Sequence, residues 1–253
     1  MPDNRQLTRE AVFRELELWP VWREKSARPL ADVQTDVTVQ ERPAPEIAPT
    51  IVAKNKPAPI AITGWDALRE AVNTCTACKL HTTRTQGVPG VGDLNADWLI
   101  VGEAPGADED AQGEPFVGQA GRLLDAMLAA IGLQRDKNVY ITNVLKSRPP
   151  GNRNPEADEV EACMPYLLKQ IELLQPKIIL ALGRFAAHSL LDTQASIAQL
   201  RGRTHPYQGV PLIVTYHPAY LLRSPGDKAL AWEDLCLARE TYSSIQANQV
   251  ISL

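Results

Sequence analysis

Four apolar runs, separated by stretches of helical character, constrain the fold of this 253-residue chain more than any other feature of its sequence. The runs are DWLIVGEA at 97–104, VYITNVLK at 139–146, KIILALG at 177–183 and VPLIVTYHP at 210–218. Helices are expected at about 120–131, at 156–174, directly after 183, and at 227–246. Continuous apolar strands that alternate with helices are typical of a parallel sheet covered on both faces. The sequence therefore predicts an α/β fold built on a central four-stranded parallel sheet.

The first 63 residues differ in composition from the rest of the chain. Residues 8–24 place apolar side chains close to helical spacing until Pro20, which predicts a short amphipathic segment. Residues 26–63 contain no aromatic side chain and are rich in Pro and Ala, a composition that buries too little surface to fold. We predict a partner-binding segment at 1–25, a flexible, disordered linker at 26–63 and a compact domain at 64–253. The amphipathic segment either docks on a partner or folds back on the domain, and the sequence favours neither.

The overall charge and the cysteine content narrow the class of protein only slightly. A net charge of -4 and a pI of about 5.6 neither indicate nor exclude nucleic-acid binding, because binding depends on local patches. The chain lacks an export signal and a run of about 18 apolar residues, so we expect a soluble, cytoplasmic protein of bacterial type. Its four cysteines are therefore interpreted as reduced thiols or metal ligands.

Unusual residues gather directly after three of the predicted strands. The loops are GEAPGADEDAQGEPFVGQAG at 102–121, NVLKSRPPGNRNP at 143–155 and YHPAYLLR at 216–223. Because ligands bind beyond the carboxyl ends of parallel strands, these loops predict a binding site. No glycine-rich phosphate motif is present, so nucleotide hydrolysis by that route is not expected. The first loop offers the carboxylate of Glu103, whereas Asp108 and Asp110 are expected to cap the following helix or to be solvated.

These three loops, in this order, resemble the motifs of the family 4 uracil-DNA glycosylases, the iron-sulfur members of the uracil-DNA glycosylase superfamily. The resemblance covers about residues 70–245. It implies a three-layer sandwich around the parallel sheet. It also implies a monofunctional DNA glycosylase of base excision repair, which flips uracil out of DNA and hydrolyses its N-glycosidic bond. Uracil-containing DNA is the implied partner.

The resemblance implies a uracil pocket, and the matching residues have suitable chemistry. Asn143 offers one acceptor and two donors for the uracil edge, and Phe116 offers an apolar face for stacking. His217 would donate to uracil O2 as negative charge develops on the leaving base. Outside such a motif, Phe116 would be interpreted as a core residue and His217 as a structural one.

The segment from Gly102 to Ala104 is implied to line the same pocket. The best-known uracil glycosylases carry an aspartate at the position of Ala104, and family 4 lacks it. Glu103 is the first candidate for positioning the attacking water, and Glu109 is the second.

Basic residues near the predicted pocket are expected to contact the DNA backbone, and an apolar residue is expected to wedge into the duplex. The predicted DNA-binding residues are Lys146, Arg148, Arg153, Arg203, Leu221 and Arg223, with Tyr220 and Leu222 as further wedge candidates. Ordinary solvated surface charges would show the same spacing.

Family 4 binds a 4Fe-4S cluster through four cysteines, and this chain matches three of them. Cys75, Cys78 and Cys163 match family ligands, whereas Ser147 stands in the fourth position, in KSRPPGNR. A serine oxygen is a much poorer ligand for iron than a thiolate. Three outcomes stay open: a cluster with one labile iron, a different metal such as zinc, or no metal. An intact 4Fe-4S cluster is not the expected outcome. Cys236 is interpreted as a buried free cysteine.

The missing ligand favours a second hypothesis, in which the domain kept its shape and lost its catalysis. FRELELWPVWREKSARP at 13–29 resembles the N-terminal peptide of the psi subunit of the bacterial clamp loader. The alternative is therefore an inactive glycosylase-like scaffold of the DNA replication machinery, tethered to the clamp loader through residues 8–24. The enzyme is the first hypothesis, because the pocket residues are all present.

Overall fold

The structure is a computed structural model that describes residues 62–251, with side chains described as far as residue 247. The predicted partner-binding segment at 1–25 and nearly all of the predicted linker at 26–63 lie outside the described residues. The first described helix is α2 (Trp65–Asn73), which begins directly after Gly64.

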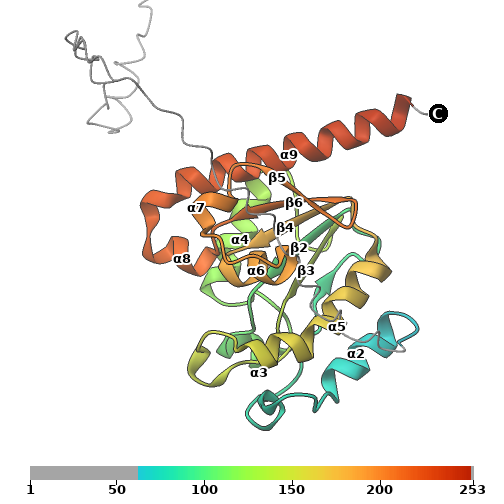
Figure 1. Cartoon of the computed structure of the whole chain (residues 1–253), viewed down its shortest axis with the longest axis vertical. Coiled ribbons are helices and arrows are strands. Elements are labelled where there is room, and N and C mark those ends of the chain that lie inside the picture. Colours follow the sequence, from blue (N-terminus) through green and yellow to red (C-terminus); the bar gives the residue numbers. More distant parts are fainter. Residues whose placement is uncertain (1–61, 252–253) are drawn as a thin grey trace, which may run out of the picture. The chain divides into compact units, whose positions relative to one another are not determined.

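A six-stranded sheet lies at the centre of the described residues, with the strand order β1-β3-β2-β4-β6-β5 (Figure 1). The four inner strands are parallel to one another: β3 (Val139–Asn143), β2 (Trp98–Gly102), β4 (Ile178–Leu182) and β6 (Val210–Thr215). Two antiparallel edge strands flank them, β1 (Val91–Gly92) and β5 (Thr204–Tyr207). The predicted parallel sheet is confirmed as the inner part of this sheet. The edge strands escape prediction because neither β1 nor β5, which reads THPY, is an apolar run.

The pleat of the strands sends alternate side chains to opposite faces, and helices cover both faces. On one face, Leu99 and Val101 pack with α5 (Ala157–Leu174), α6 (Arg184–Leu191) and α7 (Ile197–Leu200). On the other face, Trp98 and Ile100 pack with α4 (Gln119–Ala130), α8 (Pro218–Arg223) and α9 (Lys228–Ile251). The predicted arrangement of three layers is therefore confirmed.

Capping interactions explain where α5 begins and ends. At the start of α5, the Glu159 carboxylate accepts a hydrogen bond from the backbone N–H of Glu156 at 2.9 Å. The helix ends at Gln175, which adopts the left-handed conformation with φ 50°. The shorter elements are α3 (Ala107–Gln112) and three 3-10 turns at Lys79–Thr82, Pro150–Asn152 and Pro225–Asp227. Within 62–251, no helix combines the length and apolarity needed to cross a membrane.

The strand order opens a crevice at the carboxyl edge of the sheet. From β2 the chain crosses to β3 on one side, whereas from β4 it crosses to β6 on the other. The loops after β2 and β4 therefore diverge, and open α/β sheets bind their ligands at such a point. The same edge receives the residues that follow β3 and β6, because all four strands are parallel.

Candidate active site

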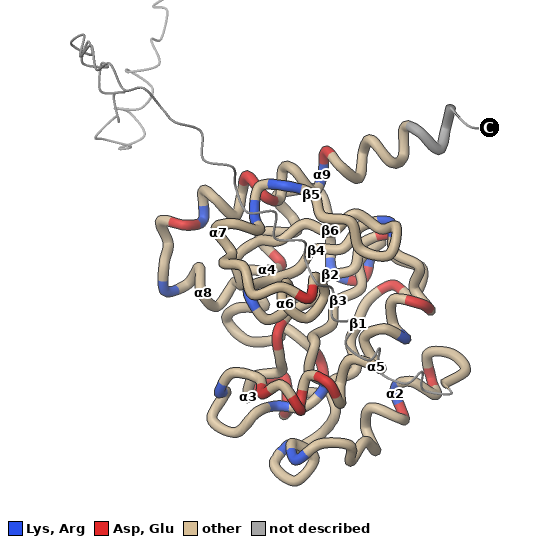
Figure 2. Tube along the Cα trace, in the orientation of Figure 1, with Lys and Arg blue, Asp and Glu red and all other residues tan. Residues whose placement is uncertain are grey.

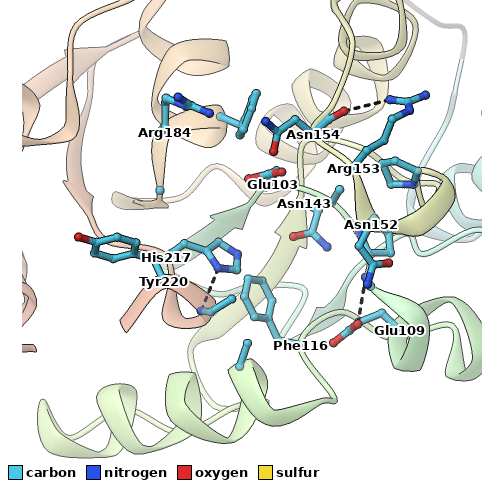
Figure 3. A pocket seen from close by; sticks show the side chains of 18 of the residues that line it. Glu103, Glu109, Phe116, Asn143, Asn152, Arg153, Asn154, Arg184, His217 and Tyr220 are labelled. Carbon is cyan, nitrogen blue, oxygen red and sulfur yellow. Dashed lines mark hydrogen bonds between the residues drawn. The ribbon is translucent and has the colours of Figure 1, made fainter. Parts of the chain in front are cut away.

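A cavity of about 660 Å³ lies at this edge of the sheet. Its walls come from the segments after β2, β3, β4 and β6 and from the loop between α3 and α4. Figure 3 shows the side chains of Glu103, Phe116, Asn143 and His217 gathered around the cavity. The fold thus brings together four side chains that the sequence places on three separate loops.

Asn143 ends β3 and presents a carboxamide that is buried but incompletely hydrogen-bonded. The residue is 2% exposed, and its Oδ1 has no hydrogen-bond partner among the residues that the structure describes. An unpaired buried polar group costs about 1–3 kcal/mol of stability. The fold therefore holds an acceptor at the cavity that a donor on a ligand would satisfy.

Gly102 ends β2 beside this carboxamide, and its lack of a side chain leaves room for the pocket residues. A Cβ atom at this position would lie 2.5 Å from Cζ of Phe116 and would also overlap Oδ1 of Asn143. Glycine is therefore required here for close approach rather than for a special backbone conformation. Ala104, two residues later, lines the cavity as predicted.

The ring of Phe116 is held in place by a loop that is fixed from outside. The φ angle of Phe116 is 57°, in the left-handed region that non-glycine residues rarely adopt. Arg135 donates from Nη1 to the carbonyl oxygen of Pro115 at 3.0 Å and from Nη2 to that of Phe116 at 2.8 Å. Gly121 lies so close that a Cβ atom there would overlap the Phe116 carbonyl oxygen. The aromatic face is therefore preorganised, and no motif in the sequence points to the supporting role of Arg135.

His217 precedes α8, and its hydrogen bonding determines which ring nitrogen carries the proton. Nδ1 accepts a hydrogen bond from the backbone N–H of Ala219 at 3.1 Å. A neutral imidazole that accepts at Nδ1 carries its proton on Nε2. Burial, together with the Arg223 cation, lowers the pKa of His217 to about 4, so the ring is neutral near pH 7. His217 therefore offers a neutral N–H donor, and its ring stacks on Phe116 with centroids 5.5 Å apart.

Glu103 follows β2 and lines the cavity with a carboxyl group of unusual basicity. Burial raises the pKa of Glu103 to about 7, and the Arg184 cation opposes this rise. Among the described residues, none donates a hydrogen bond to this carboxyl group. Arg184 begins α6 and lines the same cavity, although no motif in the sequence distinguishes it. Glu103 is therefore free to bind a water molecule and to exchange a proton near neutral pH.

Glu109 also reaches the cavity wall, but backbone groups occupy its carboxylate. One oxygen accepts from the N–H of Gly106 at 3.0 Å, and the other accepts from those of Val117 and Gly118 at 3.1 and 3.2 Å. These bonds tie the start of α3 to the loop that carries the aromatic ring. The sequence led us to expect that Asp110 caps the helix or is solvated. It does neither, because it is 3% exposed and accepts a hydrogen bond from the N–H of Thr85 at 2.9 Å.

Two predicted DNA contacts are wrong because their side chains are buried. Lys146 is 1% exposed, and its ammonium group donates to acceptors inside the domain. Leu221 is 1% exposed and packs in the core beneath α8. Adjacent residues of a helix point about 100° apart, so the neighbouring Leu222 is 37% exposed instead.

The remaining predicted contacts differ in how freely they face solvent. Arg223 is exposed and lines the cavity. Arg153 also lines it, although its Nη1 donates to the buried Glu159 at 2.9 Å. Arg148 donates a hydrogen bond to the side chain of Asn152 at 2.8 Å. Arg203 is exposed on the turn before β5, and neither it nor Arg148 lines the cavity. Figure 2 shows Lys and Arg positions spread over many elements and interleaved with Asp and Glu, rather than confined to one element.

The predicted metal ligands lie in a separate corner of the domain, which we call the cysteine corner: Cys75, Cys78, Cys163, Ser147 and Arg84. Cys78 and Cys163 lie together in a small apolar cluster, and a hydrogen bond from Cys163 lowers the pKa of the Cys78 thiol. Ser147 is 4% exposed, and its Oγ accepts a hydrogen bond from Nη1 of Arg84 at 2.8 Å. Nη2 of Arg84 donates to the carbonyl oxygens of Asn73 at 2.7 Å and Cys75 at 2.9 Å.

This donor set does not fit an intact four-thiolate cluster. In the described part of the chain, no three His, Cys, Asp or Glu side chains form a group that could hold a metal ion. The fourth position offers a hydroxyl oxygen, which already accepts from a guanidinium cation, where a soft thiolate is needed. Cys236, predicted to be buried, is partly exposed on α9 and adds no ligand to this corner.

Comparison with known proteins places this geometry in a family. Residues 89–237 match the model of the uracil DNA glycosylase superfamily. A type-4 uracil-DNA glycosylase of Archaeoglobus fulgidus is 49% identical over 168 residues, which are 63% of this chain and 83% of that protein. A type-4 enzyme of Pyrobaculum aerophilum is 45% identical over 178 residues, 67% of this chain and 90% of that protein. One of Thermotoga maritima is 45% identical over 161 residues, 63% of this chain and 83% of that protein. The chain therefore belongs to the uracil DNA glycosylase superfamily.

Proposed function

We propose that the chain is a uracil-DNA glycosylase, a hydrolase of base excision repair that removes uracil from DNA and leaves an abasic site. The observation that carries the proposal is the buried, unpartnered Oδ1 of Asn143, which shares its cavity with a fixed aromatic ring and a neutral imidazole donor. Membership of the family and the names of its type-4 relatives support the same activity.

Asn143 selects the base in this proposal. The N3–H of a flipped uracil donates to Oδ1 of Asn143, and Nδ2 donates to uracil O4. Cytosine presents an acceptor at N3 and a donor at N4, so both contacts would oppose it. Phe116 supports the face of the base, since its ring lies beside the carboxamide.

His217 and Glu103 supply the chemistry. As the bond between C1′ and N1 breaks, its electron pair moves onto the base, and Nε2–H of His217 stabilises the charge at O2. Water attacks C1′ and loses its proton toward the Glu103 carboxylate. Glu103 is preferred to Glu109 for this role, because three backbone N–H groups already bind the Glu109 carboxylate. Glu109 then acts by positioning the loop that carries Phe116.

Arg223, Arg153 and Arg148 are proposed to contact the DNA backbone around the cavity, and Leu222 replaces Leu221 as the proposed wedge. Leu222 is preferred because it is exposed, whereas Leu221 belongs to the core. Tyr220, at 36% exposure, donates from its hydroxyl to Asp227 at 2.6 Å, which holds the neighbouring turn in place.

We further infer that the domain folds without an intact 4Fe-4S cluster. The hydroxyl of Ser147 and the three hydrogen bonds of Arg84 support this inference. A cluster in related enzymes would lie at the edge of the fold, so the proposed catalysis by Glu103 and His217 does not depend on it.

The N-terminal parts of the proposal rest on the sequence alone. The division at residues 25 and 63, and the psi-like docking of residues 8–24 on a clamp loader, stay predictions about residues outside the described range. A cytoplasmic, nucleoid-associated location belongs to the same proposal, because DNA is the substrate. Deleting residues 1–26 tests the docking, since association with the clamp loader should then disappear.

An oligonucleotide assay tests the activity directly. The purified full chain is incubated with an end-labelled strand that contains one uracil, alone or in a duplex, and the product is treated with alkali. We expect cleavage at the uracil and none in a matched strand with thymine. A folded protein that produces no cleavage at high enzyme concentration would contradict the proposed function. The inactive scaffold would then be the favoured hypothesis.

A further inference from the structure

Lys146 carries a buried amino group that the proposed chemistry leaves without a role, and burial lowers its pKa to about 7. Its Nζ donates to Oγ1 of Thr142 at 2.7 Å, to the carbonyl oxygen of Asn143 at 2.5 Å and to Oε1 of Gln170 at 2.6 Å. An ammonium group has three N–H donors, so every donor has an acceptor. The amino group is therefore built into the fold by its three hydrogen-bond contacts.

The acceptors of Lys146 belong to a network that continues to the edge of the sheet. Thr142 donates from Oγ1 to the carbonyl oxygen of Pro89 at 3.0 Å, and Gln170 donates from Nε2 to the same carbonyl oxygen. Gln170 also donates to the hydroxyl of Tyr140 at 3.3 Å. Lys146 thus links β3 to α5 and to the segment before β1.

The network ends at the main chain of Asn143, the proposed base-reading residue. The Oδ1 of its carboxamide has no partner among the described residues, so no bond at that atom holds the amide in one orientation. The direction of the carboxamide therefore depends on the backbone at the end of β3. That backbone is fixed by the bond from Lys146 to the Asn143 carbonyl oxygen and by the bond from the N–H of Val144 to the carbonyl oxygen of Gly102 at 3.0 Å.

We propose that Lys146 is a positioning residue for Asn143, which aims the carboxamide at the base through a buried hydrogen-bond network. This inference rests on the proposed function. The carboxamide of Asn143 must be held in place before the base binds, because ordering it during binding would cost free energy and lower the discrimination between bases. A misplacement of about 1 Å is enough to lower a rate by about 100-fold.

A double-mutant cycle tests this role. Lys146→Met keeps the shape of the side chain and removes its donors, and we expect a kcat about 100-fold lower on the uracil strand. In the Asn143→Ala background, the same change should cost less than about 3-fold, because the group being positioned is gone. Equal costs in both backgrounds would show a general structural role and overturn the proposal.

Asp234→Asn is the matched control, because it disturbs another buried polar network, the one around Arg201, which does not line the cavity. All variants are compared well below their melting temperatures, with folding checked by circular dichroism. Asp234→Asn should lower the melting temperature while keeping kcat within about 2-fold of the parent.

A second readout does not depend on activity. In a nitrogen-15 NMR spectrum, the side-chain amide signals of Asn143 should shift or broaden in Lys146→Met and stay unchanged in Asp234→Asn. If the parent protein cleaves no uracil, the proposed function fails, and this spectrum alone decides the role of Lys146. Unchanged Asn143 signals would overturn it.

Discussion

The pocket and the cysteine corner are connected by five residues of the chain, from Asn143 to Ser147, yet they treat buried polar atoms in opposite ways. In the pocket, Oδ1 of Asn143 is buried without a partner among the described residues. In the corner, Oγ of Ser147 is buried to a similar extent, but Arg84 donates to it. An unpaired acceptor at a cavity leaves a hydrogen bond for a ligand to make, whereas the acceptor at Ser147 already receives one. The comparison supports the proposed binding role of the pocket and the inference that Ser147 is held by Arg84.

The largest effect should come from removing the unpaired acceptor. Asn143→Ala should lower kcat/KM on uracil-containing DNA by about 10³–10⁴-fold, because a site built to bind polar edges loses its selectivity without them. The melting temperature should stay the same or rise, since the change deletes a buried group whose Oδ1 is unpaired. A marked fall in melting temperature would mean that Asn143 is structural.

Filling the pocket should have the next largest effect. In Gly102→Ala, the new methyl group would collide with Phe116 and Asn143, so we expect activity about 100-fold lower. Gly226→Ala is the matched control, because a Cβ atom there meets nothing within 4 Å. Steady-state kinetics of both variants would show the difference. Equal activities would mean that Phe116 and Asn143 do not need the space that Gly102 leaves beside the cavity.

The activity should rise with pH around the pKa of Glu103, which is about 7. The carboxylate is the form that accepts a proton, so kcat/KM should increase as pH rises from about 6 to about 8. Glu103→Gln should remove this rise along with most of the activity, and a fall in activity with pH that persists in the variant would come from Lys146, whose pKa burial lowers to about 7. His217 has a pKa of about 4 and stays neutral across this range, so it should not contribute.

The same ionisation has a consequence for stability. Because the folded-state pKa of Glu103 is raised above its ordinary value of 4.5, the parent protein should lose stability as pH rises from about 4.5 to about 7. Glu103→Gln should lack this loss. Urea unfolding at pH 5 and pH 8 measures the difference, and identical pH dependence in the two proteins would contradict the raised pKa.

A change in the cysteine corner should affect stability more than catalysis. Arg84→Gln removes charge-assisted hydrogen bonds to Ser147 and Cys75, so we expect a free energy of unfolding lower by about 2 kcal/mol. The value of kcat should stay within about 2-fold of the parent. A much larger loss of activity would show that the corner and the pocket are coupled.

Metal removal should have the smallest effect. The protein purified without oxygen should hold less iron than an intact cluster requires, and a chelator should leave its melting temperature unchanged. Ser147→Cys should supply the fourth thiolate and produce absorbance near about 400 nm. A brown parent protein with four iron atoms per chain would contradict the inference that the domain folds without an intact cluster.

The inner strands and the pocket could be predicted because they leave local traces in the sequence. Continuous apolar runs mark β2, β3, β4 and β6, and three motifs mark the pocket loops. The edge strand β5 left no trace, since its sequence, THPY, carries no apolar period. The supporting residues Arg135 and Arg84 left none either, because each donates to two main-chain carbonyl oxygens, which every sequence possesses.

The sequence by itself determined the parallel α/β sheet, the family motifs and the loss of a cysteine at Ser147. The tertiary structure decided which basic and apolar residues of those motifs face the cavity. Lys146 turned inward to three buried acceptors, and Leu221 turned into the core while Leu222 stayed outside. The physical reason is that a step of one residue along a helix turns the side chain by about 100°, which is enough to move it from the core to the surface. Burial is a property of packing between distant segments, which a motif does not record.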